Sequence, residues 1–316
     1  MAPSIPRLLR LFFAVCLAVT GRADEPFLRP HDVVAFVGGE DMVALSEYGY
    51  LELLLVRALP DHQLRFRNLA WEGDTVFEQR RDLNFPTWEE QLDKVGATVV
   101  IAQFGQMESL AGKEKLPEFI AAYEKLIERM SGGRKRRVVV VQPTSPEYSN
   151  GEGRKADRKT AGLADAQWKA FPAYWKAITD LGTKIGPPFG EYSLSIGGEM
   201  TRDHIHVSDT GASFMADETV DRFLTGDKRF DIHRPLQVDD EKEFLDLIRA
   251  KNRLWFDYWR PQNWAFLAGD RTNQPSSRDH LDPSKRWFPP EREAFLPLIE
   301  AKEKEIDVLA QKLAKP

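Results

Sequence analysis

The chain has 316 residues, of which 42% are hydrophobic and 29% charged, a composition typical of a globular protein. Its formal net charge of -5 at pH 7 gives no overall basic character, so we expect no nucleic-acid partner. A chain of this length can bury one large core, or a main domain with a smaller appendage.

Residues 1–23 have the pattern of a secretory signal peptide. Two arginines precede an apolar run over residues 11–19, and small residues at Gly21 and Ala23 resemble a cleavage site. The run is too short for a permanent membrane-spanning helix, although an uncleaved anchor is the alternative. We expect export to the periplasm or the extracellular space, with no stable membrane insertion after cleavage. Cleavage after Ala23 would also remove Cys16, the only cysteine of the chain.

Four runs rich in β-branched residues are typical of strands buried on both faces. They read VVAFVG, LRFRNLA, TVVIAQFG and RVVVVQP, and they begin at Val33, Leu64, Thr98 and Arg137. Helical patterns cover residues 46–59, 87–95, 116–133 and 165–186. This alternation predicts an α/β fold, a three-layer sandwich with a mainly parallel sheet. Ligands of such sheets bind at the carboxyl ends of the strands.

The chain divides into an α/β domain over residues 24–226 and a helical C-terminal extension over residues 227–316. Within the first part, the polar stretch 145–165 is expected to be a loop with little regular structure. The extension carries an aromatic set, for which packing on the main domain is favoured over a platform for sugar rings. The set is Trp255, Phe256, Tyr258, Trp259, Trp264 and Phe266.

Four short blocks follow one another at the expected strand ends or before a helix. They are Gly38-Gly39-Glu40-Asp41, then NLAWEGDT with Gly73, then FGQMES with Gly105 and Met107, and last RDHIHVSDTG with Asp203 and His206. In these blocks the chain resembles the SGNH hydrolase superfamily, the GDSL-type lipases and esterases, between Val33 and about Leu224. The YGYLE helix and the C-terminal extension resemble an exported bacterial branch of the superfamily.

The resemblance implies an SGNH or flavodoxin-like fold and an ester-hydrolysing ancestry. In the family, a serine on the first turn attacks the ester, a histidine takes the proton of the serine, and an aspartate three residues earlier orients the histidine. Here His206 and Asp203 match the base and its orienting residue, and Gly73 matches an oxyanion donor. A carboxylate replaces the serine: Glu40 in one register, Asp41 if the turn is shifted by one. The Asn position of the third block is Met107, whose thioether donates no hydrogen bond.

Several interpretations of Glu40 remain open. It could attack an ester itself, although this would give a mixed anhydride, and an ionised carboxylate needs no general base. It could form a glycosidase-like carboxylate pair with Asp203 or Glu108. It could form an ion pair with His206 that keeps the loop folded and inactive towards esters. A longer turn could instead present Ser46, which is expected to face solvent.

Other polar residues near the blocks also have two interpretations. Asp74 and Thr75 are expected to cap the next helix rather than bind a ligand. Glu108 and Ser109 follow the third strand, so they are candidate pocket residues together with Gly39 and Asp41. A metal site formed by Glu40, Asp41, His204 and His206 is disfavoured, so neither a metal nor a cofactor is predicted.

The sequence therefore predicts a protein of the hydrolase family that acts at ester bonds, including carbohydrate esters, or derives from enzymes that do. The substitutions at Glu40 and Met107 favour a catalytically impaired relative. The alternatives are an active esterase with an atypical site and a non-catalytic module that binds a carbohydrate or a protein. The expected ligand is a small molecule or a carbohydrate ester.

Overall fold

The computed structural model describes residues 27–79, 85–146, 158–185, 200–203, 205–223, 236–261, 271, 274 and 278–314. The expected signal peptide, His204, Trp264 and Phe266 lie outside these residues.

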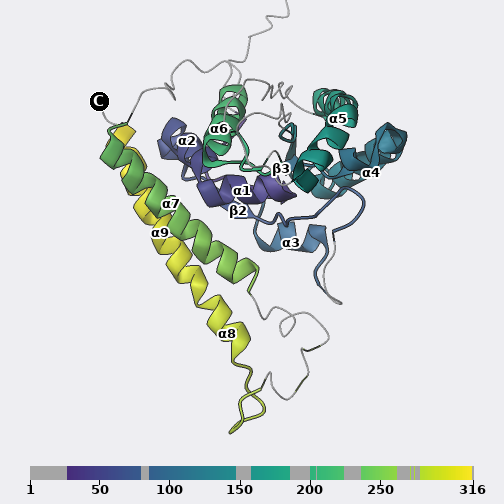
Figure 1. The fold of residues 1–316 in the computed structure, drawn as a ribbon. Helices are drawn as coiled ribbons and strands as arrows, with labels where there is room; N and C mark the ends of the chain where they lie inside the picture. Colours follow the sequence, from purple (N-terminus) through teal and green to yellow (C-terminus); the bar gives the residue numbers. More distant parts are fainter. Residues whose placement is uncertain are drawn as a thin grey trace, which may run out of the picture.

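A parallel sheet forms the centre of the molecule (Figure 1). Its strands are β1 (Val33–Gly38), β2 (Arg65–Asn68), β3 (Val99–Gln103) and β4 (Arg137–Val141), in the order β2-β1-β3-β4. Phe36 of β1 pairs with Asn68 on one side and with Ile101 on the other. The four predicted strands and their parallel arrangement are confirmed.

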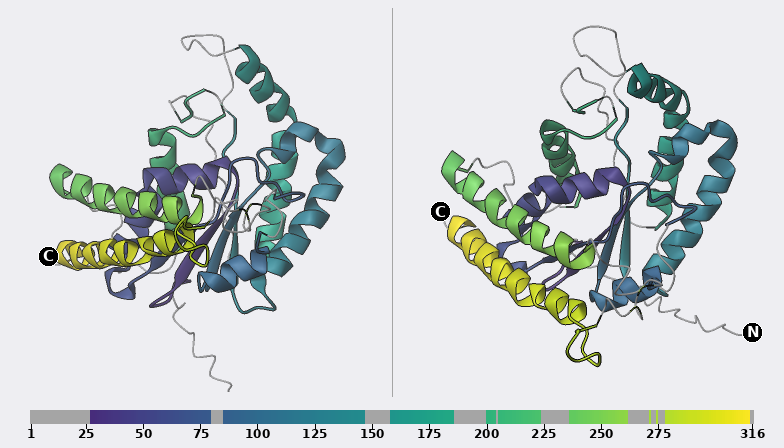
Figure 2. Two further views of the ribbon diagram at one scale, coloured as in Figure 1. Left: turned by 90° about the horizontal axis from the view of Figure 1, so that it is seen from below. Right: turned by 60° about the horizontal axis from the view of Figure 1, so that its bottom comes forward.

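Helices cover both faces of the sheet (Figure 2). One face packs against α1 (Glu40–Tyr48), α2 (Tyr50–Ala58) and α6 (Asp209–Phe223); the other packs against α3 (Trp88–Lys94), α4 (Leu116–Ser131) and α5 (Arg158–Ile185). Side chains alternate across a strand, so Phe36 joins the first cluster and Val37 the second. Burial of both faces explains the continuous apolar runs of the strands. The predicted three-layer α/β fold is confirmed.

Local signals explain where the helices begin and end, and they correct two expectations. Gly49, with a left-handed φ of 78°, separates α1 from α2. Thr87 caps α3 in a capping box with Glu90, so Asp74 and Thr75 do not cap this helix. Helix α5 begins at Arg158, so the last part of the expected loop 145–165 is helical. Short 3₁₀ helices lie at Pro60–His62, Glu108–Ala111 and Lys113–Lys115.

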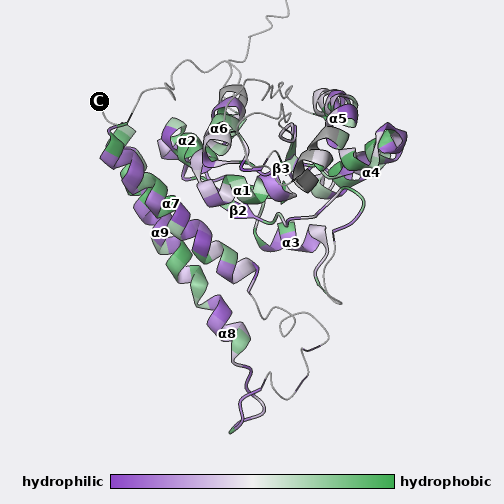
Figure 3. Ribbon diagram, viewed as in Figure 1, coloured by the Kyte–Doolittle hydropathy of each residue, from purple (hydrophilic) through white to green (hydrophobic). Residues whose placement is uncertain are grey.

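The C-terminal segment forms α7 (Val238–Trp259), α8 (Phe288–Glu293) and α9 (Phe295–Ala314). Helices α7 and α9 lie side by side along the β2 side of the sheet (Figures 1 and 2). Both carry hydrophobic and hydrophilic positions (Figure 3). Part of their apolar residues, such as Phe244 and Ile306, belong to the same cluster as Phe36, and others, such as Trp255 and Ile299, belong to the cluster on the α3 side of the sheet.

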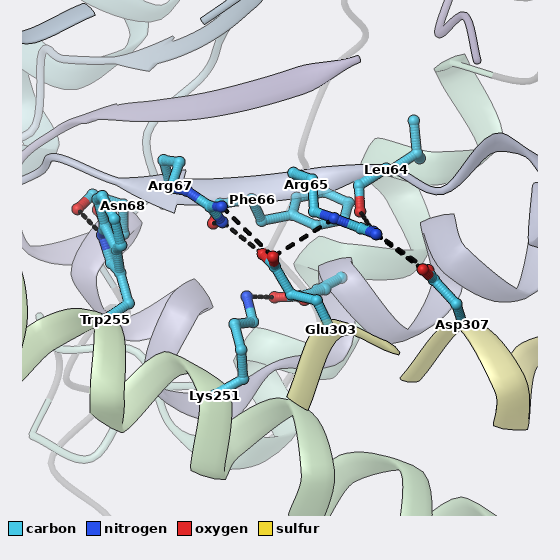
Figure 4. A network of polar contacts seen from close by, with 10 residues as sticks. Leu64, Arg65, Phe66, Arg67, Asn68, Lys251, Trp255, Glu303 and Asp307 are labelled. Carbon is cyan, nitrogen blue, oxygen red and sulfur yellow. Dashed lines mark hydrogen bonds and ion pairs between the residues drawn. The ribbon is translucent and has the colours of Figure 1, made fainter. Parts of the chain in front are cut away.

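Polar contacts also join the two C-terminal helices to β2 (Figure 4). Arg67 forms an ion pair with Glu303 at 2.5 Å, and Arg65 forms one with Asp307 at 2.8 Å. The indole nitrogen of Trp255 donates to the carbonyl oxygen of Asn68 at 2.8 Å. The extension therefore covers a strand whose outer edge would otherwise be open. None of the described helices has a stretch long and apolar enough to cross a membrane.

Candidate functional site

A shallow pocket lies at the carboxyl ends of β1 and β3. Residues of the first, second and third blocks line it, including Gly39, Glu40, Asp74, Gly105 and Met107. The strand order changes direction between β1 and β3, which is where open α/β sheets bind ligands. Three of the four sequence blocks therefore meet at one end of the sheet.

The turn after β1 places Glu40 as the first residue of α1. A Cβ on Gly38 would lie 2.3 Å from the carbonyl oxygen of Gln103, so this close approach of two strand ends requires glycine. The half-buried Glu40 carboxylate lies 3.5 Å from the Arg202 guanidinium. Burial raises the pKa of Glu40; the charges of His206 and Arg202 oppose the rise, and neighbouring carboxylates add to it.

Asp41 is buried and has a different set of partners. Its Oδ2 accepts a hydrogen bond from the backbone N–H of Thr144 at 2.8 Å, and its Oδ1 accepts one from Nε2 of Gln106 at 3.3 Å. Burial raises the pKa of Asp41 to about 6, although these hydrogen bonds oppose the shift. Asp41 therefore ties the first turn to the ends of β3 and β4. The charge of His206 lowers the pKa of Glu40.

His206 and Asp203 lie in a tight loop before α6. Backbone hydrogen bonds from Arg202 to His206 and from Ser208 to Met200 close this loop. Asp203 Oδ2 lies 2.6 Å from His206 Nδ1, while Oδ1 accepts the backbone N–H of His206 at 2.9 Å. Partial burial raises the pKa of Asp203, but the hydrogen bonds outweigh this and hold it below its ordinary value. The geometry leaves Nε2 as the ring atom that can take a proton.

The ion pair expected between Glu40 and His206 is replaced by a different pairing. Glu40 pairs with Arg202, and the His206 ring pairs with Asp203. The charge of His206 still lowers the pKa of Glu40, so the two groups lie within electrostatic reach. His206 pairs with Asp203 because the Asp-x-x-His spacing places both residues in the same short loop, where the Asp203 carboxylate lies against the imidazole ring.

The two expected oxyanion positions have different surroundings. Gly73 adopts a left-handed φ of 84° in the turn after β2, with no atom within 4 Å of an added Cβ. Met107 precedes the 3₁₀ helix Glu108–Ala111 and is 45% exposed, so its thioether faces solvent in part. A thioether has no N–H group, so Met107 cannot donate the hydrogen bond that an amide side chain would donate.

Gln106 is a site residue that the sequence analysis did not single out. Its side-chain amide contacts the Asp41 carboxylate and also donates to the Ile205 carbonyl oxygen at 3.3 Å. It therefore links the first turn to the loop of His206. The FGQMES block contains this residue, but only the fold shows that its side chain turns inward.

Glu108 lines the pocket and holds two of its loops together. Its carboxylate accepts the N–H of Val76 at 2.7 Å and that of Gly105 at 2.8 Å. Burial raises the pKa of Glu108, and these N–H groups oppose the shift. Ser109 is buried, and its hydroxyl donates to the Gln106 carbonyl oxygen at 2.7 Å. Both residues support the pocket walls.

The remaining sequence candidates lie in the core or outside the described residues. Ser46 is 9% exposed and lies against α7, so the expectation that it faces solvent is wrong. The favoured packing role of the aromatic set holds for Trp255, Tyr258 and Trp259, which belong to the cluster on the α3 side of the sheet. Within the described ranges, no group of three or more His, Cys, Asp or Glu side chains is placed to hold a metal ion.

Fold and site together define an α/β protein in which an Asp–His pair lies within electrostatic reach of the turn after β1. No family model and no curated protein matches the sequence. The structure is similar to that of BT4096, described as a gut microbial diltiazem-metabolizing enzyme, at 13% identity and a TM-score of 0.51, over 91% of this chain and 95% of that one.

Matches to proteins described as SGNH or GDSL-like hydrolases cover a smaller share of this chain. A GDSL-like lipase from Parabacteroides merdae shares 13% identity over 64% of this chain and 98% of that one, at a TM-score of 0.44. An SGNH hydrolase from Slackia heliotrinireducens shares 14% identity over 61% and 98%, at a TM-score of 0.42. The similarity to BT4096 shows a shared α/β fold, in agreement with the fold class predicted from the sequence.

Proposed function

We propose that this protein is a catalytically impaired relative of the SGNH ester hydrolases, which keeps the base of the family but not its nucleophile. The observation that carries the proposal is the position of Glu40. A carboxylate stands at the start of α1, within the electrostatic reach of the Asp203–His206 pair. A base at this position has no hydroxyl to activate.

The chemistry of Glu40 supports loss of serine-type hydrolysis. Attack by its carboxylate on an ester would form a mixed anhydride and expel an alkoxide. The raised pKa of Glu40 makes it a weaker leaving group from that anhydride but also leaves more of it protonated and non-nucleophilic. Proton uptake by His206 does not assist the attack itself, because an ionised carboxylate carries no proton to remove.

The oxyanion site is reduced as well. By the resemblance to the family, the N–H groups of Glu40 and Gly73 match two of its oxyanion donors, and Met107 stands at the third donor position. Loss of one such donor costs on the order of 10²–10³ in rate. From Glu40 and Met107 together we infer that the pocket binds a polar ligand, either a small molecule or a carbohydrate, and does not hydrolyse it.

Restoring the missing groups tests the proposal. Turnover of p-nitrophenyl acetate and of acetylated sugars is measured for the parent, Glu40→Ser, Met107→Asn and the double variant. We expect no turnover above the buffer rate for the parent, a gain for Glu40→Ser, and a further gain of about 10²-fold for the double variant. His206→Ala in the double variant should remove the gain. Glu128→Ser, which changes an exposed glutamate on α4, is the matched control.

The intact Asp203–His206 pair favours one alternative, an active hydrolase in which His206 activates a water molecule. This enzyme would need no side-chain nucleophile, and Glu40 would hold the water or share its proton. Turnover by the parent that His206→Ala abolishes would establish this alternative and overturn the impaired-enzyme proposal.

The proposed site of action is outside the cytoplasm. The basis is the sequence of residues 1–23, which lie outside the described residues. Fractionation of expressing cells, with N-terminal sequencing of the protein, tests this point. Cleavage after Ala23 is the expected result, and an intact N-terminus in the cytoplasmic fraction would contradict it.

A further inference from the structure

The loop after β2, residues 71–74, contributes Asp74 to the wall of the pocket at the strand ends. The N–H of Trp71 donates to the carbonyl oxygen of Gly38 at 3.1 Å, and the N–H of Asp74 donates to the carbonyl oxygen of Trp71 at 3.1 Å. The carbonyl oxygen of Asp74 would lie 3.3 Å from a Cβ on Gly39, so the loop packs directly against the first turn. The position of this loop therefore decides the shape of the pocket beside that turn.

Arg260, the residue that follows α7, contacts two side chains of this loop. Its guanidinium carbon lies 4.4 Å from the centre of the Trp71 ring, and its Nη2 lies 2.7 Å from a carboxylate oxygen of Glu72. A planar guanidinium can stack on an aromatic ring and pair with a carboxylate at the same time. The Arg260 side chain is 18% exposed, so solvent screens these contacts less than those of a fully exposed arginine.

The local sequence explains why Arg260 stands at this place. Pro261 follows it and disfavours a helical backbone at Arg260, so α7 ends immediately before this residue. The backbone N–H of Arg260 still donates to the carbonyl oxygen of Phe256 at 2.7 Å, which holds it at the helix end. Earlier on α7, the indole of Trp255 donates to the carbonyl oxygen of Asn68 at the end of β2. Helix α7 and its last residue therefore contact the second block at two points.

The charge of the loop also acts on the first turn. Burial raises the pKa of Glu40, and the charge of Glu72 adds to this rise. Partial burial raises the pKa of Glu72, but the hydrogen bond from Arg260 and its charge outweigh this and hold the pKa below its ordinary value. Arg260 therefore keeps Glu72 ionised and paired beside Glu40.

We propose that Arg260 is a positioning residue, through which the C-terminal extension holds the loop of residues 71–74 against the first turn. Arg260 is not among the residues that line the pocket at the strand ends, so it acts through the loop. The extension is then part of the site rather than an appendage beside it. Its role in holding the loop does not depend on whether Glu40 supports chemistry.

Amide hydrogen exchange of the full chain tests the position of the loop. Arg260→Gln removes both the charge and the stacking guanidinium, so the N–H groups of Trp71 and Asp74 should exchange about tenfold faster than in the parent. The N–H of Val100 in β3 reports opening of the whole sheet, and the effect on the loop is the excess over any change at Val100. Arg260→Lys keeps a charge for Glu72 and should restore part of the protection.

Arg253→Gln is the matched control. Arg253 lies on the same helix and has the same two kinds of contact: an ion pair with Asp257 at 2.9 Å, and the Phe256 ring at 5.3 Å from its guanidinium carbon. Neither of these partners belongs to the loop after β2. The variant should leave the exchange of both loop amides unchanged.

A kinetic measurement separates a role in the site from a role in stability alone. It rests on the proposed function, because it uses the restored variant that carries Glu40→Ser and Met107→Asn. Adding Arg260→Gln should lower its kcat about tenfold or more and change KM less, since the displaced loop carries Gly73, whose N–H would act in the transition state. Adding Arg253→Gln should change neither constant.

Three results would overturn the proposal. They are loop amides that exchange no faster in Arg260→Gln than Val100 accounts for, an increase that Arg253→Gln reproduces, or a kcat of the restored variant that Arg260→Gln leaves unchanged. If Arg260→Gln fails to fold, Glu72→Gln, which removes the ion pair at an exposed position, replaces it in each comparison. If the restored variant shows no turnover, the proposed function fails, and the exchange of the loop amides then decides the role of Arg260 by itself.

Discussion

Lys251 of α7 and Glu52 of α2 form an ion pair inside the protein, with 2.8 Å between Lys251 Nζ and Glu52 Oε2. Their side chains are 0% and 5% exposed. Burial lowers the pKa of Lys251 and raises that of Glu52, and each charge opposes the shift of the other. Lys251 lies beside the contacts of Arg65 and Arg67 with α9 (Figure 4). The C-terminal helices are therefore joined to the α/β layers by buried charges as well as by apolar packing.

Breaking this pair should destabilise the protein strongly. Lys251→Met leaves the Glu52 carboxylate buried without its partner, which costs about 3–5 kcal/mol of the free energy of unfolding. Replacing both residues, with Lys251→Met and Glu52→Leu, should recover most of this loss, because no charge is left buried and unpaired. Urea denaturation of the three proteins measures the effect. Lys242→Met, which removes an exposed ion pair with Asp246 on the same helix, should change the free energy of unfolding far less than Lys251→Met, because solvent screens an exposed pair. A similar cost for the two lysine variants would contradict the prediction.

Asp41 should make stability depend on pH. Its pKa is raised from 3.8 to about 6 by burial, so the folded protein binds this proton more tightly than the unfolded chain. The associated stability is fully present below about pH 4 and is lost as the pH rises through about 6. Asp41→Asn, which keeps an oxygen for the Thr144 N–H, should be more stable than the parent at pH 8 by roughly 1–3 kcal/mol. The difference should vanish near pH 4. Urea denaturation at both pH values measures this, and equal stabilities at pH 8 would show that burial of Asp41 carries no such cost.

Gly211 should be essential for the loop that carries His206. A Cβ at this position would lie 2.0 Å from the carbonyl oxygen of Met200, a backbone atom held by the N–H of Ser208. Gly211→Ala should therefore displace the loop and lower the free energy of unfolding by about 1–3 kcal/mol or more. Gly162→Ala is the control, since an added Cβ on this α5 residue meets nothing within 4 Å. That variant should be neutral or more stable by up to about 1 kcal/mol. Thermal unfolding of the two variants compares them, and equal effects would rule out the steric explanation.

The pKa of Glu40 should respond in opposite directions to two neighbours. Arg202→Gln removes a positive charge that lowers this pKa, so the pKa should rise further. Glu72→Gln removes a negative charge that raises it, so the pKa should fall. Titration of the carboxyl carbon by NMR follows Glu40 directly, with Glu40→Gln to assign the signal. A shift of the same sign in both variants would mean that Glu40 does not lie between these charges.

Much of the fold follows from the sequence because its signals are local and repeated. The four apolar runs at Val33, Leu64, Thr98 and Arg137 form the four parallel strands, since only a strand covered on both faces needs such runs. Because the strands run parallel, the three blocks that follow β1, β2 and β3 meet at the carboxyl end of the sheet. The helical start at Arg158 was missed because the polar stretch before it contains several residues typical of loops.

The sequence alone determined the residue types of the site: a carboxylate on the turn after β1, a thioether after β3, and an Asp-x-x-His pair. The sequence does not show where these side chains point, because their direction depends on contacts between residues far apart in the chain. Only the tertiary structure decided that Asp41 turns inward to Thr144 and Gln106, that Glu40 pairs with Arg202, and that Ser46 is buried against α7.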